Sequence, residues 1–395
     1  MRDRVFVIVA STLLLMAQAP ATQVEHPNLN PNLSGSLTLK KVPLEVVAVP
    51  PFSLKTFADK LEERLKNRSV GYQFVVSFND TAMVKRAGGS ARQSPDTSPR
   101  AMTADDKYNL ASVSKTITAA AAVKVLNAKG IDLDSKMSKF LPDSFKPTRT
   151  VQSITFRELL THRSGIRCET PVTREGLEQC VAGGIKMADK SEFKYNNSNF
   201  ALFRFLIPEL EDFSRVAKAN PMQLAKNYPA RYVAYVQKNI FDPAGLPAIF
   251  CKPTDASPAL CYQFPCPAGN GTDFGDATER CGSQGWNMSS AQLATFISTL
   301  LYTEKILPQP LRDKMKDEGL GLYQGSVKGS VISYNHGGFF PGKHEEGNNW
   351  NAGELNSLAY GLSNGVSVAL IVNSQYGNNR SIFNAVNDTA KEMIE

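Results

Sequence analysis

A serine and a lysine three positions apart are the strongest chemical candidates in this chain of 395 residues. Ser112 and Lys115 open an alanine-rich stretch, and a spacing of three puts both side chains on one helix face, one turn apart. A serine hydroxyl becomes nucleophilic when a neighbour removes its proton, and a lysine can do so when desolvation or a nearby cation lowers the pKa of its amine. Free N–H groups at a helix N-terminus favour an oxyanion beside the serine. The spacing alone is common, and a second copy occurs at Ser191 and Lys194.

A phenol and an amide form the second candidate group, in the sequence Tyr195-Asn196-Asn197. The phenol of Tyr195 can carry a proton to or from a reacting group. The amide of Asn197 can hydrogen-bond a substrate carbonyl and also hold Lys115. The same three residues also fit an ordinary loop with a capping asparagine.

The third candidate group is His336-Gly337-Gly338, which follows a strand-like run. Glycines at such a position let a substrate approach the edge of a strand closely. The backbone N–H of Phe339 would then be a second oxyanion donor beside that of Ser112. Taken alone, the segment equally fits a buried histidine beside a bulge.

These groups must be positioned by elements that the hydrophobic periodicity predicts. Strands are expected near both ends of the chain, with helices and loops between about 132 and 300, and Gly88–Pro99 is expected to be a polar loop. The predicted strands are Val70–Phe78, Ala82–Arg86 after a turn at Asn79-Asp80, Val331–Tyr334 and Val366–Asn373. The predicted helices are Phe52–Arg68, Asn109–Lys129, Thr155–Thr161, Phe200–Leu210, Ala230–Ile240, Ala291–Thr303 and a final helix from about Ser381.

The first 21 residues have the pattern of a secretory signal peptide. Arg2 and Arg4 precede the apolar stretch Val5–Met16, and small residues follow, with cleavage expected after Ala21. An uncleaved anchor is the alternative. The sequence therefore predicts a secreted or periplasmic protein, in which residues 22–51 form an extended linker ahead of a catalytic domain over 52–390.

Six cysteines fit an exported chain, because an even number in an oxidising compartment indicates disulfides. Six cysteines allow 15 pairings, and pairing of neighbours is the interpretation chosen here: Cys168 with Cys180, Cys251 with Cys261, and Cys266 with Cys281. A zinc site is disfavoured because the cysteine spacings are not of the CxxC type and the four histidines form no cluster. No metal or other cofactor is expected.

Composition narrows the class of protein. With 42% hydrophobic and 21% charged residues, the chain is neither disordered nor fibrous. The net charge is +7, but the basic residues are scattered, so no nucleic-acid partner is expected. Only the N-terminal run approaches membrane length, so no stable membrane insertion is expected either. The oligomeric state is left open.

Taken together, the motifs resemble those of the serine β-lactamase and DD-peptidase superfamily, in the branch with class C β-lactamases, D-aminopeptidases and family VIII esterases. The resemblance covers roughly residues 52–390. It is carried, in order along the chain, by Leu110-Ala-Ser-Val-Ser-Lys-Thr116, Ile154-Thr-Phe-Arg-Glu-Leu-Leu-Thr-His-Arg-Ser-Gly165, Tyr195-Asn-Asn-Ser-Asn-Phe-Ala-Leu202, Asn239-Ile-Phe-Asp-Pro-Ala-Gly-Leu246 and His336-Gly-Gly338.

The resemblance implies an α/β (α+β) fold. An antiparallel sheet flanked by helices would use about 52–130 and 320–390, and an all-helical lobe would use about 131–319. It also implies a site that acts on a small-molecule or peptide acyl substrate. Ser112 would be acylated, Lys115 would be its base or the partner of that base, and Tyr195 would be a general base and later an acid. Asn197 would position substrate and lysine, while His162 would pack beneath the site.

The third motif departs from the lysine, hydroxyl residue and glycine that β-lactamases carry there. His336 replaces the lysine and Gly337 replaces the hydroxyl residue, so a permanent cation and an O–H donor are missing. Ester or amide hydrolysis is therefore favoured, with a class C-type β-lactamase or penicillin-binding protein as the alternative. A secreted homologue that binds without catalysis is a third reading.

An α/β-hydrolase is a rival from another fold, because Gly361-Leu-Ser-Asn-Gly365 spells G-x-S-x-G. That motif needs a helix after it, whereas a strand pattern follows here, so Ser363–Gly365 is predicted to be a hairpin turn.

Overall fold

The structure, a computed structural model, describes residues 53–394 apart from 170–171, 213–226, 266–269, 342–343, 346–348, 351–352 and 378–380. The predicted signal peptide (1–21) and linker (22–51) lie outside the described residues. Their boundaries therefore stay predictions, as does the division of 52–390 into two lobes.

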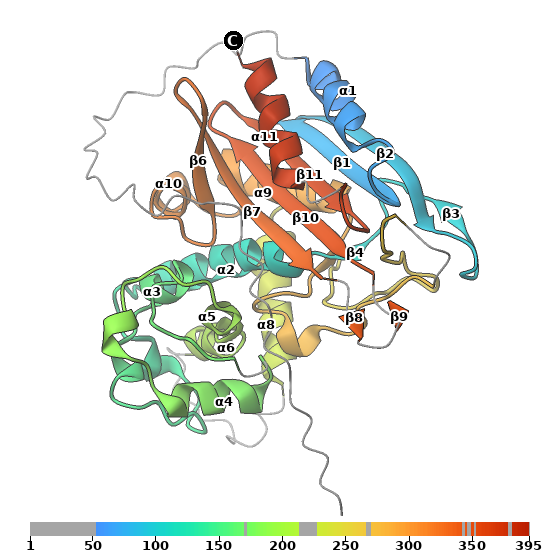
Figure 1. The fold of residues 1–395 in the computed structure, drawn as a ribbon. Coiled ribbons are helices and arrows are strands. Elements are labelled where there is room, and N and C mark those ends of the chain that lie inside the picture. The colour runs from blue at the N-terminus through green and yellow to red at the C-terminus, as the bar shows by residue number, and fades with distance from the viewer. Residues whose placement is uncertain are drawn as a thin grey trace, which may run out of the picture. The chain divides into compact units, whose positions relative to one another are not determined.

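A seven-stranded antiparallel sheet joins the two ends of the described chain (Figure 1). Its strand order is β3-β2-β1-β11-β10-β7-β6, so the N-terminal strand β1 lies beside the C-terminal strand β11. The predicted antiparallel sheet built from both ends of the chain is thus confirmed. Two short pairs, β4 with β5 and β8 with β9, lie outside this sheet. The described strands are β1 (Gly71–Phe78), β2 (Ala82–Arg92), β3 (Arg100–Ala101), β4 (Tyr108–Asn109), β5 (Asn287–Met288), β6 (Tyr323–Lys328), β7 (Val331–Phe340), β8 (His344–Glu345), β9 (Asn349–Trp350), β10 (Leu355–Leu362) and β11 (Val366–Val372).

Helices cover both faces of this sheet (Figure 1). Along the chain, further helices occupy most of the segment between the N-terminal and the C-terminal strands of the sheet. Helices α1 and α11 pack on one face, and α9 packs on the other. The helices are α1 (Leu54–Leu65), α2 (Ser114–Ala128), α3 (Phe156–Leu160), α4 (Arg174–Gly183), α5 (Asn197–Ala201), α6 (Phe203–Asp212), α8 (Tyr228–Val236), α9 (Ser290–Tyr302), α10 (Gln309–Asp317) and α11 (Ile382–Met393).

Alternation along the central strands divides the core into two clusters. Phe74 and Val76 of β1 pack with Phe57 of α1, whereas Val75 between them belongs to the cluster on the opposite face. Successive strand residues point to opposite faces, so a strand that is apolar at every position is buried on both sides. The sheet is therefore a rigid interior layer.

Helix α2 is the central helix of the described region, and its first turn carries Lys115. Residues 114 to 123 are all buried, and the run Ala119–Ala122 has no exposed surface. A helix that is buried on all sides belongs to a core, and alanines let neighbouring elements approach its axis closely. The helix contacts β7 as well as α6 and α8, so it connects the sheet to the helical region.

The predicted turn at Asn79-Asp80 is confirmed: both residues have positive φ (46° and 62°), as the central residues of a type I′ turn do, and the N–H of Thr81 donates to the carbonyl of Phe78. The predicted loop Gly88–Pro99 is wrong over its first residues, because β2 continues to Arg92. The reason is packing: a β-carbon at Gly88 would lie 2.4 Å from the hydroxyl oxygen of Tyr72, its cross-strand neighbour. Glycine here makes room for an aromatic side chain within a strand.

The predicted turn at Ser363–Gly365 is also confirmed, since it connects β10 to β11 and Gly365 has φ of 93°. The Ser363 hydroxyl oxygen accepts a hydrogen bond from the backbone N–H of Ile332 at 3.1 Å. The element directly after this serine is strand β11 and not a helix, so the α/β-hydrolase reading is wrong.

One predicted disulfide is confirmed and the other two are wrong. Cys168 is bonded to Cys180, but Cys251 is bonded to Cys281 instead of Cys261. The backbone at Cys261 is paired with Thr272, and the next residue donates its N–H to the carbonyl of Asn373, so this segment lies on the sheet. Cys261 is buried there, and Cys266 lies outside the described residues.

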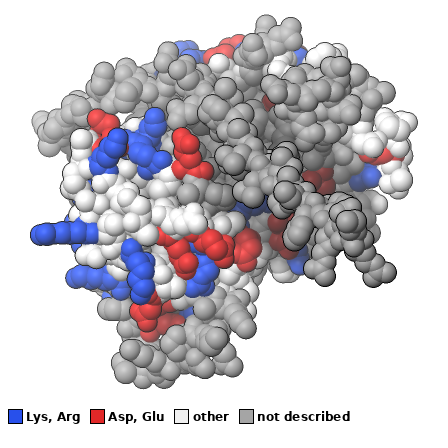
Figure 2. Space-filling view, turned by 60° about the horizontal axis from the view of Figure 1, so that its bottom comes forward, with Lys and Arg blue, Asp and Glu red and all other residues white. Residues whose placement is uncertain are grey.

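Charges of both signs share the described surface that Figure 2 shows. Basic and acidic side chains interleave on this face, and acidic side chains occupy much of its middle. Among the described helices, none is both long enough and apolar enough to span a bilayer.

Candidate active site

The serine of the first motif lies at a sharp backbone turn. Residues Ala111–Val113 form a 3-10 turn directly before α2, whereas the sequence predicted one helix from Asn109. Ala111 has φ of 45°, which is unusual for a residue with a side chain, and its N–H is held by the Asn109 side-chain oxygen at 2.9 Å. Ser112 is partly exposed while both its neighbours are buried. The turn therefore presents the hydroxyl at the surface of a buried segment.

The amine of Lys115 is fully buried and has three oxygen neighbours. Its Nζ lies 3.0 Å from Ser112 Oγ, 2.8 Å from Asn197 Oδ1 and 2.8 Å from the backbone oxygen of Ser283. The last two oxygens can only accept, so each takes one N–H of the amine. A neutral amine has two N–H groups and one lone pair. The lone pair is therefore left to face the hydroxyl of Ser112.

Burial favours this neutral form. Desolvation holds the pKa of the Lys115 amine well below its usual value. The predicted serine–lysine pair thus has the geometry and the electrostatics of a nucleophile beside its base.

The phenol of Tyr195 completes a short chain of hydrogen bonds. Its Oη donates to Ser112 Oγ at 2.6 Å, and the Lys115 amine lies 4.9 Å from the centre of its ring. Loss of solvent raises the pKa of Tyr195, although its hydrogen bond with Ser112 acts in the opposite direction. The resting phenol is therefore protonated. Ser112 can accept from the phenol and donate to the amine at the same time.

Asn196 fixes the segment between Tyr195 and Asn197. Its side-chain oxygen accepts from the N–H of Ser198 at the start of α5, and its side-chain nitrogen donates to the carbonyl of Cys168 at 2.9 Å. Asn196 thus fixes the backbone between two residues that both contact the Ser112–Lys115 pair.

His162 lies beneath this segment, as the resemblance implied. The ring is buried, its Nδ1 accepts from the backbone N–H of Asn196 at 3.3 Å, and its centre lies 4.5 Å from the centre of the Tyr195 ring. It therefore supports the phenol from below.

The third motif lies at the end of β7, beyond the last pairing with β6. That pairing ends at Asn335, while β7 stays paired with β10 as far as Phe340. His336 is buried, its Nδ1 lies 2.8 Å from the Gly337 carbonyl, and its ring centre lies 5.1 Å from that of Tyr323. This end of β7 contacts the turn that carries Ser112.

Gly338 is the point of contact between β7 and that turn. A β-carbon there would lie 2.3 Å from the Leu110 carbonyl oxygen, 2.3 Å from Ser357 Oγ and 3.1 Å from the Ser112 backbone nitrogen. Only glycine lets the strand lie this close to the turn that carries Ser112. The structure thus brings Ser112, Lys115, Tyr195, Asn197 and the third motif together, while the donor role of the Phe339 N–H stays a prediction.

Gly338→Ala should move the nucleophile turn. Relief of the clash with backbone should displace Ser112 by a fraction of an ångström or more, lowering activity by roughly 100-fold and stability by about 1–3 kcal/mol. Thermal unfolding and ester turnover measure both effects. Gly337→Ala is the control for stability, because its nearest neighbour would be the Ser357 backbone oxygen at 4.0 Å. Equal unfolding temperatures for the two variants would contradict the close approach.

Two contributors were missed by the sequence analysis. The Ser283 carbonyl carries no residue-type signal, because any residue has one. Tyr323 lies in β6, which was not predicted, and burial raises the pKa of its phenol beside Tyr195. The only sequence signal for Tyr323 was its aromatic side chain shortly before the predicted strand that begins at Val331. Within the described residues, no three His, Cys, Asp or Glu side chains gather as metal ligands.

Comparison with known proteins agrees with this geometry. Residues 57–390 match the family model described as Beta-lactamase. The chain therefore belongs to the Beta-lactamase family of hydrolases, and it has the serine β-lactamase/DD-peptidase fold. A curated relative, Beta-lactamase-like protein 4 of Dictyostelium discoideum, is 24% identical over 235 residues, which cover 54% of this chain and 39% of that protein.

Solved structures from bacteria show the same fold. A D-stereospecific amidohydrolase from Streptomyces sp. is 21% identical, with a TM-score of 0.61 over 84% of this chain and 98% of its own. The D-amino acid amidase from Ochrobactrum anthropi SV3 is 18% identical, with a TM-score of 0.63 over 86% and 97%. FmtA from Staphylococcus aureus is 18% identical, with a TM-score of 0.61 over 86% of each chain. At these identities the likeness concerns the fold.

Proposed function

We propose that this protein hydrolyses an ester or amide through a covalent acyl-enzyme on Ser112. The observation that carries the proposal is the buried Lys115 amine. Its Nζ lies 3.0 Å from Ser112 Oγ. Its two N–H groups are taken by oxygens that can only accept, Asn197 Oδ1 and the Ser283 carbonyl oxygen. An inactive binding homologue would gain nothing from a buried lysine without a counter-charge, because burial of the amine lowers stability whether or not the residue is used.

The reaction begins when the Ser112 oxygen attacks the substrate carbonyl and its proton passes to Lys115 Nζ. The N–H groups of Ser112 and Phe339 would stabilise the negative oxygen of the tetrahedral intermediate. Tyr195 then gives its proton to the leaving alcohol or amine as the bond to it breaks, and the Lys115 ammonium returns a proton to the phenolate. The products of this half are the leaving group and an ester on Ser112.

Hydrolysis of that ester reverses the proton path. Tyr195 first passes its proton to the neutral Lys115 amine. A water molecule then attacks the ester carbonyl and gives a proton to the tyrosinate, and the Lys115 ammonium protonates Ser112 as the carboxylic acid leaves. A transient tyrosinate is a strong base because burial raises the pKa of Tyr195, so it can deprotonate water. No proton is lost or gained over the cycle.

The third motif supports esters and amides over β-lactams. A histidine side chain is not a permanent cation and Gly337 has no side chain, so this motif lacks the lysine and the hydroxyl that bind a substrate carboxylate. Two of the bacterial proteins with this fold are named as amidases or amidohydrolases acting on D-amino acids or with D-stereospecificity. That likeness supports small acyl amides or peptides as the substrate class to test.

The proposed function is tested by assaying nitrophenyl acyl esters, D-aminoacyl amides, D-Ala-D-Ala peptides and a chromogenic cephalosporin side by side. Esters or amides should give the highest kcat/KM, because their binding does not need a charged anchor at the third motif. Efficient turnover of the cephalosporin alone would favour the β-lactamase alternative. Absence of turnover and of acyl-enzyme with every substrate would favour the inactive binding homologue.

We also propose that the protein acts outside the cytoplasm. Two disulfides lie in the described chain, and such bonds persist in oxidising compartments. This supports the secretory signal predicted for residues 1–21.

A further inference from the structure

The two disulfides lie next to the two segments that bind the Lys115 amine. One of these segments supplies Asn197 Oδ1, and the other supplies the carbonyl of Ser283. The Asn197 segment contacts a disulfide-bonded cysteine, Cys168, through the neighbouring Asn196. The Ser283 segment contains another, Cys281, two residues before the carbonyl that binds the lysine. This placement suggests a role in the reaction itself.

The first disulfide supports the Tyr195 and Asn197 side. Cys168 is bonded to Cys180 of α4, and the carbonyl of Cys168 accepts from the Asn196 side chain at 2.9 Å. Asn196 lies between the phenol and the amide that contact the reacting pair. Movement of the backbone at Cys168 would therefore be transmitted to both.

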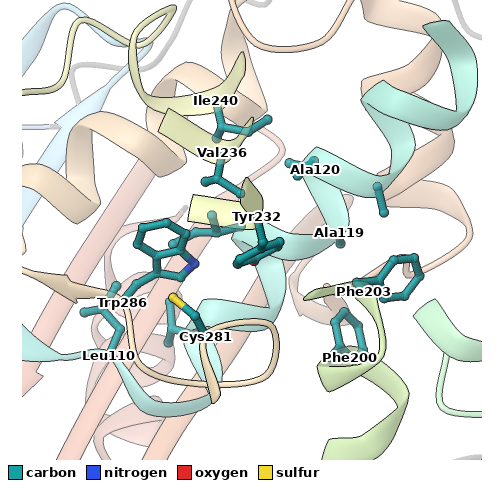
Figure 3. Packing of buried hydrophobic residues seen from close by; sticks show 14 of the residues in the cluster. Leu110, Ala119, Ala120, Phe200, Phe203, Tyr232, Val236, Ile240, Cys281 and Trp286 are labelled. Carbon is teal, nitrogen blue, oxygen red and sulfur yellow. The ribbon is translucent and has the colours of Figure 1, made fainter. Parts of the chain in front are cut away.

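The second disulfide supports the Ser283 side. Cys281 is fully buried beside Trp286 and Leu110, close to the start of α2 (Figure 3). The next two carbonyls bind that helix, Gly282 accepting from Thr118 Oγ1 at 2.7 Å and Ser283 from Lys115 at 2.8 Å. Its partner Cys251 lies 30 residues earlier, and its carbonyl accepts from the N–H of Ala277.

Close packing makes the position of this segment critical. A β-carbon at Gly282 would lie 2.7 Å from the backbone oxygen of Phe200, so the chain passes between α2 and the end of α5 without spare room. A small outward shift would break the carbonyl contact and admit water to the amine.

We propose that the two disulfides are positioning elements of the active site, which hold the two acceptors that aim the Lys115 lone pair at Ser112. The proposal rests on the proposed function. Opening Cys251–Cys281 should loosen the Ser283 carbonyl, and opening Cys168–Cys180 should loosen Tyr195 and Asn197. A misplacement of about 1 Å in such a site lowers the rate by roughly 10- to 100-fold.

The pH dependence separates this role from general stabilisation. Hydration of Lys115 removes the desolvation that lowers its pKa, so the amine would be protonated up to a higher pH. The titratable group that faces the Lys115 amine is the phenol of Tyr195. Tyr323 of β6 lies near Tyr195, and His336 of β7 lies against Tyr323. Two charged residues, Glu279 and Arg280, lie on the turn before Ser283. None of these is removed when a disulfide is opened.

The test compares Cys251→Ala/Cys281→Ala and Cys168→Ala/Cys180→Ala with the wild type. The rate of Ser112 acylation by a fluorophosphonate probe is followed from pH 5 to 10, at temperatures where circular dichroism shows each variant folded. Cys261→Ala is the matched control, because Cys261 is buried but belongs to neither disulfide. We expect a 10- to 100-fold loss at pH 7 in the double variants, a higher midpoint pH for Cys251→Ala/Cys281→Ala, and no change in the control.

A second measurement does not need catalysis. The pKa of Lys115 is read by NMR of 15N-lysine protein, with Lys115→Met assigning the signal, in the oxidised wild type and in folded protein after reduction. Because Cys251 and Cys281 are buried, mass spectrometry of alkylated thiols first confirms that the bonds are open. An upward shift of the Lys115 pKa on reduction of the wild type supports the proposal, and this measurement can be made even if the double variants do not fold. Unchanged acylation rate, midpoint and Lys115 pKa would overturn it. A wild type that is never acylated would overturn the proposed function, while the lysine pKa would still decide the role of the disulfides.

Discussion

Ser112→Ala is expected to abolish covalent labelling and to lower turnover by at least about 1,000-fold. The acyl intermediate requires the hydroxyl oxygen, and the remaining oxyanion donors can give only residual catalysis. Ser112 is partly exposed, and its hydroxyl contacts only the Tyr195 phenol and the Lys115 amine among the hydrogen bonds of the described site. The fold should therefore survive. Mass spectrometry after incubation with a fluorophosphonate and with a penicillin-type probe measures the loss.

The matched control is Ser191→Ala, in the second serine–lysine pair. Ser191 and Lys194 are both exposed, and Lys194 has no desolvation comparable to that of Lys115. Ser191 has φ of 73°, so serine and alanine carry the same backbone strain there. Labelling should be unchanged in Ser191→Ala. Retention of the label in Ser112→Ala would show that another residue is the nucleophile.

Lys115→Met is the second expected large effect, with acylation slowed by roughly 100- to 10,000-fold. Methionine fills a similar volume without an amine, so the loss reports removal of the base. Lys115→Arg should be as slow, because a guanidinium stays protonated. Stopped-flow acylation kinetics with an activated ester, together with thermal unfolding to confirm the fold, provide the measurement. A rate within tenfold of the wild type in both variants would exclude Lys115 as the base.

The pH dependence of the wild type follows from the same lysine. Because the pKa of Lys115 is lowered in the folded state, acylation should rise with pH through that lowered pKa and level off well below the ordinary value of 10.5. The unfolded state binds more protons than the folded state between the two pKa values. Stability of the wild type relative to Lys115→Met should therefore increase with pH across this window and be constant below it. Denaturant unfolding of both proteins at several pH values checks the sign.

Local patterns predicted most of the elements of the fold. The helices from Phe52, Ala291 and about Ser381, and the strand from Val366, all lie where hydrophobic periodicity indicated. Strand β10 was missed, although it is a central strand. The predicted start of the helix at Asn109 is wrong, because Asn109 lies in β4, residues Ala111–Val113 form a 3-10 turn and α2 begins at Ser114. The turn at Ala111 is imposed by its contacts with Asn109 and β7 and not by its own residue type.

The sequence by itself determined which residue types could act, because a hydroxyl, an amine, a phenol and an amide keep their chemistry wherever they lie. It also determined the family, since the order of the motifs along the chain is a property of the sequence. Only the tertiary structure distinguished the two serine–lysine pairs and pointed to Ser112 and Lys115 as the candidate pair. Spacing is identical in both pairs, but the amine of Lys115 alone is desolvated and is oriented by Asn197 and Ser283, 82 and 168 residues away. Disulfide pairing was decided in the same way, because it depends on which distant segments the core brings together, and separation along the chain carries little of that information.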